Sequence, residues 1–144
     1  MAEGWLTEAP ALHPVQTENA HPLNRAYDRL VAEVPRHEAM ALARSEPDRF
    51  MWAWEDEPQS LADGILDDVT YDWLGVLEGV FDTGGWPVLI SEEQVAEAHA
   101  RIKAVTGINA SYTGTSGFAG LLATEPELPA GERIAVLITG VERG

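Results

Sequence analysis

The stretch WPVLISEEQVAEAHARIKAVTG (residues 86–107) has the pattern of a short strand that leads directly into a helix. Its first five residues, Trp86–Ile90, are mostly apolar and suit a buried strand. Ser91 follows, and Gln94 stands three residues later, which is the spacing of a helix capping box. Gly107 then supplies a residue that tolerates the left-handed backbone on which many helices end. The stretch therefore predicts one strand–helix unit of an α/β fold.

The other segments continue this alternation. Strands are expected at Leu12–Gln16 and at Ile134–Ile138, where five consecutive apolar residues predict a strand buried on both faces. Four further helices are expected: one beginning at Pro22, one over His37–Arg44, one from Ile65 with Val69, Trp73, Val76 and Val80 on its inner face, and a short one after a glycine-rich turn. The pattern predicts an α/β domain with a small parallel sheet and flanking helices. The length suits one domain, residues 1–144.

A long connection over residues 45–64 lies within this domain. It places three aromatic residues, Phe50, Trp52 and Trp54, in an otherwise acidic loop. A loop of this length in a small domain is usually functional or wraps a neighbour. We therefore expect its aromatic side chains to be available for packing on a partner.

The net charge restricts the possible partners. The chain has 9 basic and 24 acidic residues, which gives a formal charge of −15. A surface of this sign repels phosphate backbones and anionic lipids, so we expect neither nucleic-acid nor membrane binding. There are no cysteines, which excludes disulfides and thiolate chemistry and is compatible with a reducing compartment. No signal peptide or membrane span is visible, and a cytoplasmic location is expected.

Candidates for chemistry within the chain are few. No two of the four histidines stand at a metal-ligand spacing, so no metal site is predicted. The single lysine, Lys103, lies on the outward face of its expected helix. Because no nucleophile, base and orienting group occur together, the sequence predicts no catalytic residue and no complete small enzyme.

Two segments rich in hydroxyls and glycine leave alternatives open. TGTSGFAG (Thr113–Gly120) has a glycine at every third position, with Thr115 and Ser116 where a helix is expected to begin. Such a segment suits either an anion at the helix start or close packing of a helix on a sheet. Thr139 ends the last expected strand, a position where ligands of parallel sheets bind. Its hydroxyl could contact a ligand or stabilise a turn.

The order of several segments resembles a known family. HPVQTENAHPLNRAY, SLADGI, VLISEEQVAEAHARIKAVTGI, TGTSGFAGL and GERIAVLITG follow one another as in the C-terminal portion of threonine synthase-like enzymes. These are fold type II pyridoxal-phosphate enzymes, a class that also contains threonine dehydratase. The resemblance runs from about Leu12 to Gly140, and it implies the C-terminal part of the large domain of that fold. The chain would thus be a single partial α/β domain.

The resemblance also implies site residues. In the family, a Ser or Thr at the end of the last strand contacts the pyridine nitrogen of pyridoxal phosphate; the matching residue is Thr139, followed by Gly140. SLADGI resembles a segment that lines the cofactor ring, so Ala62 and Gly64 are candidates through their backbone. TGTSGFAG is similar to a family segment that usually reads Glu-Pro-x-Ser-Ala, although Thr113 and Gly114 replace the Glu-Pro pair. This similarity makes Thr115 and Ser116 the remaining cofactor-binding candidates.

The family motifs that would complete such an enzyme are absent from this sequence. The cofactor-binding lysine, the Ser-x-x-x-Gly-Asn substrate loop and the glycine-rich phosphate cradle all precede the matching region in the family. The resemblance implies a subunit or part of a threonine synthase-like lyase, not catalytic alone. It would bind pyridoxal phosphate and a small amino-acid substrate only with a complementary N-terminal chain, within an oligomer. The alternative is a stand-alone, non-catalytic binding or regulatory module.

Overall fold

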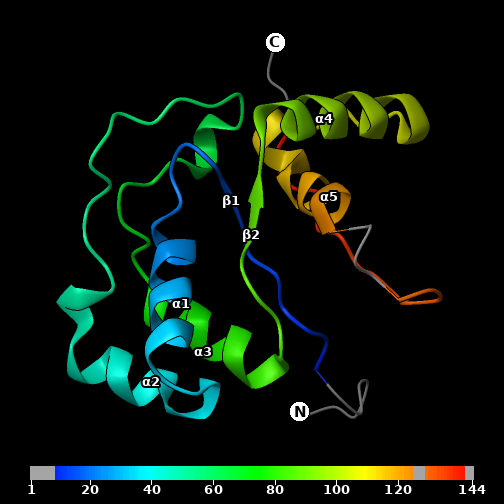
Figure 1. Cartoon of the computed structure of the whole chain (residues 1–144). Helices are drawn as coiled ribbons and strands as arrows, with labels where there is room; N and C mark the ends of the chain where they lie inside the picture. Colours follow the sequence, from blue (N-terminus) through cyan, green and yellow to red (C-terminus); the bar gives the residue numbers. More distant parts are fainter. Residues whose placement is uncertain (1–8, 125–128, 142–144) are drawn as a thin grey trace.

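The structure, a computed structural model, describes residues 9–124 and 129–141. It has the expected α/β class, with a small parallel sheet between two groups of helices (Figure 1). In chain order, the elements are β1 (Val15–Thr17), α1 (Pro22–Glu33), α2 (Arg36–Ser45), η1 (Pro47–Arg49), η2 (Asp63–Ile65), α3 (Trp73–Thr83), β2 (Val88–Ile90), α4 (Glu92–Thr106) and α5 (Tyr112–Thr124). No helix in the described ranges has the length and apolar character needed to cross a membrane.

The sheet consists of β1 and β2, which pair in parallel with Val15 opposite Val88. The pairing is extended at both ends, because Val88 N donates to Pro14 O at 2.8 Å and Glu18 N donates to Ile90 O at 3.1 Å. Both strands were expected, and both are shorter than their apolar patterns suggest. Helices α1, α2 and α3 all lie in the long crossover between them, which is the connection that a parallel pair requires.

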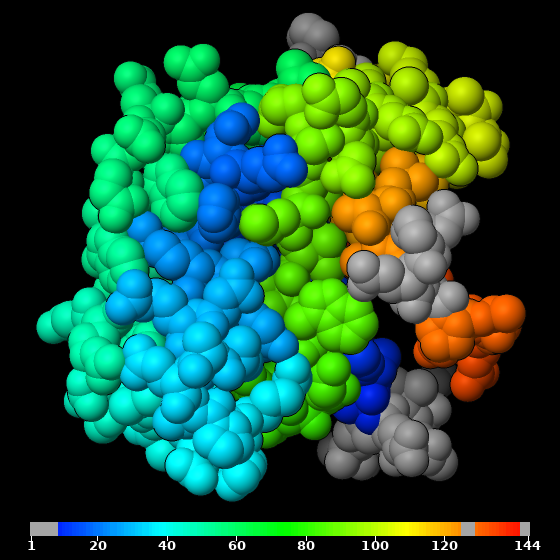
Figure 2. Space-filling model, viewed as in Figure 1, coloured from blue at the N-terminus to red at the C-terminus, as the bar shows by residue number. Residues whose placement is uncertain are grey.

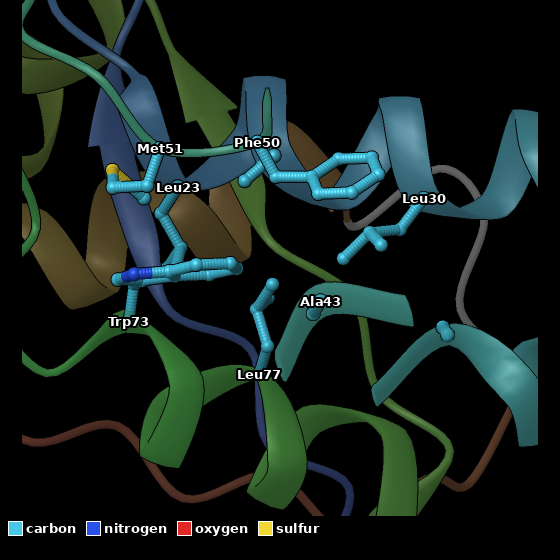
Figure 3. Close-up of a cluster of buried hydrophobic side chains, with 9 residues drawn as sticks. Leu23, Leu30, Ala43, Phe50, Met51, Trp73 and Leu77 are labelled. Carbon is cyan, nitrogen blue, oxygen red and sulfur yellow. The ribbon is translucent and has the colours of Figure 1, made fainter. Parts of the chain in front are cut away.

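One hydrophobic core joins α1, α2 and α3 to the chain that follows α2. Leu23 and Leu30 of α1 point toward Leu77 of α3, and Phe50 and Met51 close the cluster (Figure 3). Phe50 is fully buried in this core. The expectation that the loop aromatics are available to a partner is therefore wrong for Phe50, because its ring is already used inside this chain.

The rest of the long connection is fastened to α1 through Arg25. The Arg25 guanidinium lies 3.7 Å from the centre of the Trp52 ring, and its nitrogens bond the Glu55 carboxylate at 2.9 Å and the Trp52 carbonyl at 2.6 Å. The Trp54 ring lies tilted against the His21 ring, with the ring centres 4.4 Å apart. The hydrogen bond from the Trp52 indole, followed by smaller effects that include Arg25, lowers the pKa of Glu55. The two tryptophans are thus half-buried against α1 rather than projecting from the surface.

Helix α3 begins later than expected, at Trp73 instead of Ile65. Asp63–Ile65 form the 3₁₀ turn η2, and the Asp68 carbonyl accepts a hydrogen bond from Trp54 N at 2.8 Å. The Asp68 carbonyl is thus bonded to the long connection, and residues 66–72 are not helical. The apolar spacing of Ile65 and Val69 is therefore not helical, and the buried side of α3 is formed by Trp73, Leu77 and Val80.

Both ends of helix α4 have the structure that the sequence predicts. Ser91 and Gln94 form both bonds of the capping box, and Gly107 takes the left-handed conformation at φ 72°. Helix α5 begins at Tyr112, earlier than expected, because the Ser111 hydroxyl accepts a hydrogen bond from Gly114 N at 3.0 Å and caps it. The three glycines therefore lie inside α5, not in a turn before it. Gly120 packs on β1, since a Cβ there would lie 2.5 Å from a methyl carbon of Val15.

The expected buried strand Ile134–Ile138 is not present. This segment is extended but forms no strand with β1 or β2, and Ile134 and Leu137 are exposed at 49% and 81%. The expectation was wrong because a continuous apolar run becomes a buried strand only where both of its faces are covered. Helix α5 contacts this segment through Gly114 and Gly117.

Candidate functional site

Three segments that are distant in sequence meet at the N-terminal end of α5. Gly64 N, in η2, donates to the Thr113 hydroxyl at 3.1 Å. Thr139 N, in the C-terminal segment, donates to the Gly114 carbonyl at 3.1 Å. Neighbouring residues 113 and 114 thus hold η2 on one side and the C-terminal segment on the other. We call this place the α5 corner, formed by residues 62–64, 111–114 and 139–140.

Close backbone approach explains why glycines occupy this corner. A Cβ at position 114 would lie 1.6 Å from the Thr139 carbonyl oxygen, which no side chain allows. A Cβ at position 64 would lie 2.9 Å from the Thr113 hydroxyl oxygen. Gly140 has φ 65°, the left-handed conformation that favours glycine, and lies beside the Ser111 hydroxyl. The geometry of the corner therefore depends on these three positions.

Helix α4 positions the η2 side of the corner. The Glu92 carboxylate, at the start of α4, accepts from Leu61 N at 2.9 Å, and the Ser60 hydroxyl accepts from Ala62 N at 3.0 Å. Ala62 is fully buried and packs with the sheet, Val95 and Ala119. The residues before Gly64 are thus fixed to α4 and the sheet, while Gly64 itself is exposed.

The six sequence-predicted site residues divide into two groups. Ala62, Gly64, Thr139 and Gly140 lie at or beside the α5 corner, and the Thr139 residue is exposed. Thr115 and Ser116 are buried within α5, where their hydroxyls donate to the backbone carbonyls of Ser111 and Tyr112. A direct ligand contact by either of these two hydroxyls stays a prediction, and their present bonds leave each with acceptor capacity only.

Two residues of the corner had no assigned role in the sequence analysis. Thr113 binds η2 through its hydroxyl, and Ser111 caps α5 and lies against Gly140. A serine three residues before a helical amide is a common N-cap signal, so the position of Ser111 was recognisable. The bond of Thr113 to Gly64 was not, because it joins residues 49 apart in sequence.

The contacts that join the corner are made by neutral groups, although the corner also contains the exposed carboxylate of Asp63. The contacts that join its three segments use hydroxyls, backbone amides, carbonyls and glycines. No group of three or more His, Asp or Glu in the described part of the chain is placed to hold a metal ion. Lys103 is in the second half of α4 and is exposed. The contacts that join the corner therefore contain no acid–base pair.

The described fold is a parallel α/β unit in which α5 covers the sheet and holds the C-terminal segment. It is similar to part of a solved structure, the crystal structure of a threonine deaminase from T.th., with a TM-score of 0.64 and 20% sequence identity. The match covers 92% of this chain and 40% of that chain, so this chain spans less than half the length of the structure it matches. No family model and no curated protein sequence matches it. The likeness confirms the expected α/β fold.

Proposed function

We propose that this chain is the C-terminal part or subunit of a pyridoxal-phosphate-dependent, threonine synthase-like lyase, and that it forms one wall of the cofactor pocket. One observation carries the proposal. The two segments that the family resemblance relates to the cofactor ring, around Ala62–Gly64 and at Thr139–Gly140, meet at the α5 corner, where Thr113 and Gly114 of the third matching segment join them. The fold likeness to part of a threonine deaminase supports the same reading.

The residues at the corner fit the ring side of pyridoxal phosphate. Thr139 is an exposed residue, and its hydroxyl is a neutral hydrogen-bonding group that suits a pyridine nitrogen. The exposed backbone at Gly64 would lie along the ring, the buried Ala62 would support it from the core, and Gly140 would allow close approach. When bound, the cofactor supplies an electron sink for bond cleavage in an amino acid, and a neutral partner on its nitrogen moderates that sink toward elimination and replacement. Thr115 and Ser116 would support the wall from within α5.

The same residues do not fit the rest of the cofactor. The contacts that join the described segments of the corner include no cation for a phosphate, and the single lysine of the chain lies on α4, outside these contacts. A second polypeptide that carries the lysine and the phosphate loop would supply these functions. The chain's coverage of 40% of the similar structure leaves room for such a partner.

The direct test is reconstitution. The chain is mixed with pyridoxal phosphate and with a fold type II N-terminal chain, encoded in the same genome, that carries the lysine and phosphate loop. We expect a complex in analytical ultracentrifugation, a visible absorbance band of bound cofactor, and release of a keto acid from a hydroxy amino acid. Each chain alone should give neither the band nor the product. Absence of both a complex and a band in the mixture would reject the proposal.

Replacing Thr139 tests its assigned role in that complex. Thr139→Val keeps the shape and removes the hydroxyl, so it should lower kcat by about tenfold to a hundredfold, the effect of one unpaired buried group. The cofactor band should shift, and Thr139→Ser should restore both. Because Thr139 is exposed in this chain, the melting temperature of the chain alone should not change. An equal kcat for Thr139→Val and the parent would show that the Thr139 hydroxyl has no role at the site.

The alternative is a stand-alone, non-catalytic binding or regulatory module. It is favoured by the two hydrophobic cores, which this chain forms from its own residues. Isothermal titration calorimetry with free amino acids and with free pyridoxal phosphate distinguishes the two functions. Saturable binding of an amino acid by the chain alone, with no complex on addition of the N-terminal chain, would establish the alternative.

A further inference from the structure

The C-terminal segment, residues 134–141, is uncharged and mostly apolar, and all of its residues except Val136 and Ile138 are exposed. Leu137 is exposed at 81% and Val141 at 61%, in a chain whose net charge is −15. Figure 2 shows the orange residues that lead into this segment standing out from the body of the molecule. An exposed run of this kind is unusual on a soluble monomer and marks a surface that another molecule covers.

The segment already lies along α5 as a strand lies under a helix. The Leu137 carbonyl and a Val136 methyl lie 3.2 and 3.3 Å from where a Cβ of Gly117 would be, and the Thr139 carbonyl lies against Gly114. Gly117 therefore faces Leu137, and Gly114 faces Thr139, so the segment and α5 run in opposite directions. That is the relation of strand and helix in a parallel α/β sheet. At its other end, α5 packs on β1 through Gly120.

The hydrogen-bonding edges of the segment are not used within the described residues. The backbone bond found for positions 134–141 runs from Thr139 N to Gly114 O, to the helix and not to a strand. Beside the segment is a hollow of about 290 Å³ that is lined by the apolar residues Phe118, Leu121, Leu122 and Ile134 and also by Arg101 and Glu132. Open backbone edges next to a partly apolar hollow are features that strand addition uses.

We propose that residues 134–140 form a strand in a sheet of the partner chain, paired in parallel with an apolar partner strand. The inference rests on the proposed function, because the partner is the N-terminal chain of that proposal. Two observations disfavour a second copy as the occupant. Symmetric pairing of one segment with itself across a two-fold axis gives an antiparallel ladder, whereas the direction of α5 suits a parallel one. Two copies would also bring two charges of −15 together.

The test uses two exposed apolar residues in matched substitutions. Leu137→Asp places a charge in the proposed ladder, whereas Val105→Asp places one on α4, at 84% exposure against 81% for Leu137. Binding of the N-terminal chain is measured by titration. We expect Leu137→Asp to weaken binding by about a hundredfold or more, because the charge would be buried without a partner, and Val105→Asp to bind as the parent does. Both variants should have the melting temperature of the parent, since both positions are exposed.

Hydrogen exchange gives a second measurement, which uses the parent chain and requires no substitution. Amides of residues 134–138 should exchange rapidly in the chain alone and slowly in the complex. If the parent forms the complex but Leu137→Asp binds equally and these amides stay unprotected, the inference is overturned and the proposed function remains. If no complex forms with the parent, the proposed function itself fails. Dimerisation of the parent alone that Leu137→Asp abolishes would make a second copy the occupant and overturn the commitment to a partner chain.

Discussion

Gly114→Ala is expected to release the C-terminal segment from α5 and to abolish cofactor binding by the completed complex. The added Cβ would stand 1.6 Å from the Thr139 carbonyl oxygen, and backbone atoms at that distance must separate. The helix itself should tolerate the change, because Ala is favoured over Gly inside helices by roughly 0.5–1 kcal/mol. The expected result is thus a chain that stays folded while Thr139 leaves the corner.

The measurement needs no partner at first. Thr139 N donates to Gly114 O, so its amide should exchange slowly in the parent and rapidly in Gly114→Ala. Gly117→Ala is the matched control in the same helix, since its Cβ would lie 3.2 Å from the Leu137 carbonyl and needs only a small shift. In the complex, Gly117→Ala should keep the cofactor band that Gly114→Ala loses. Protection of the Thr139 amide in Gly114→Ala would show that the corner does not have this geometry.

Elements specified by neighbouring residues were predictable from the sequence. The capping box of Ser91 and Gln94 and the left-handed Gly107 define α4 through contacts within a few residues. The start of α3 was not predictable, because the competing bond comes from Trp54, fourteen residues before Asp68. The fate of Ile134–Ile138 was missed for a related reason. An apolar run reports that burial is favourable, but it does not say which molecule supplies the cover.

In the candidate site, too, features set by neighbouring residues were predictable and those set by distant residues were not. Thr139 was singled out by its place at the end of an expected strand and then by a family resemblance, whereas Ala62 and Gly64 were selected through the resemblance alone. The structure brings them to the α5 corner through Thr113 and Gly114, whose bonds span 49 residues in one case. Thr115 and Ser116 were selected from the TGTSGFAG segment, where the helix was expected to begin. Because α5 begins three residues earlier, at Tyr112, both hydroxyls donate to carbonyls of the preceding turn. The prediction of α5 erred by placing its glycines in a turn before the helix.

Phe50→Ala is expected to cause a large loss of stability, by about 3–5 kcal/mol, because it leaves a cavity in a packed core. Phe50 is fully buried among side chains from α1, α2 and α3, so no single element can move to fill the space. Domains of this size are stable by roughly 5–15 kcal/mol, so the variant should be partly unfolded in moderate urea where the parent is folded. Urea denaturation followed by far-ultraviolet circular dichroism measures the difference.

Tyr71→Ala is the matched control, since it also removes an aromatic ring but from a residue that is 86% exposed. Its free energy of unfolding should stay within about 0.5 kcal/mol of the parent. The pair of variants decides how the connection over residues 45–64 is used. A large effect for Phe50→Ala means that the connection is a structural part of the helical core before any partner binds. Equal, small effects for both variants would mean that Phe50 is free in solution, and the original expectation of an aromatic docking loop would then be correct.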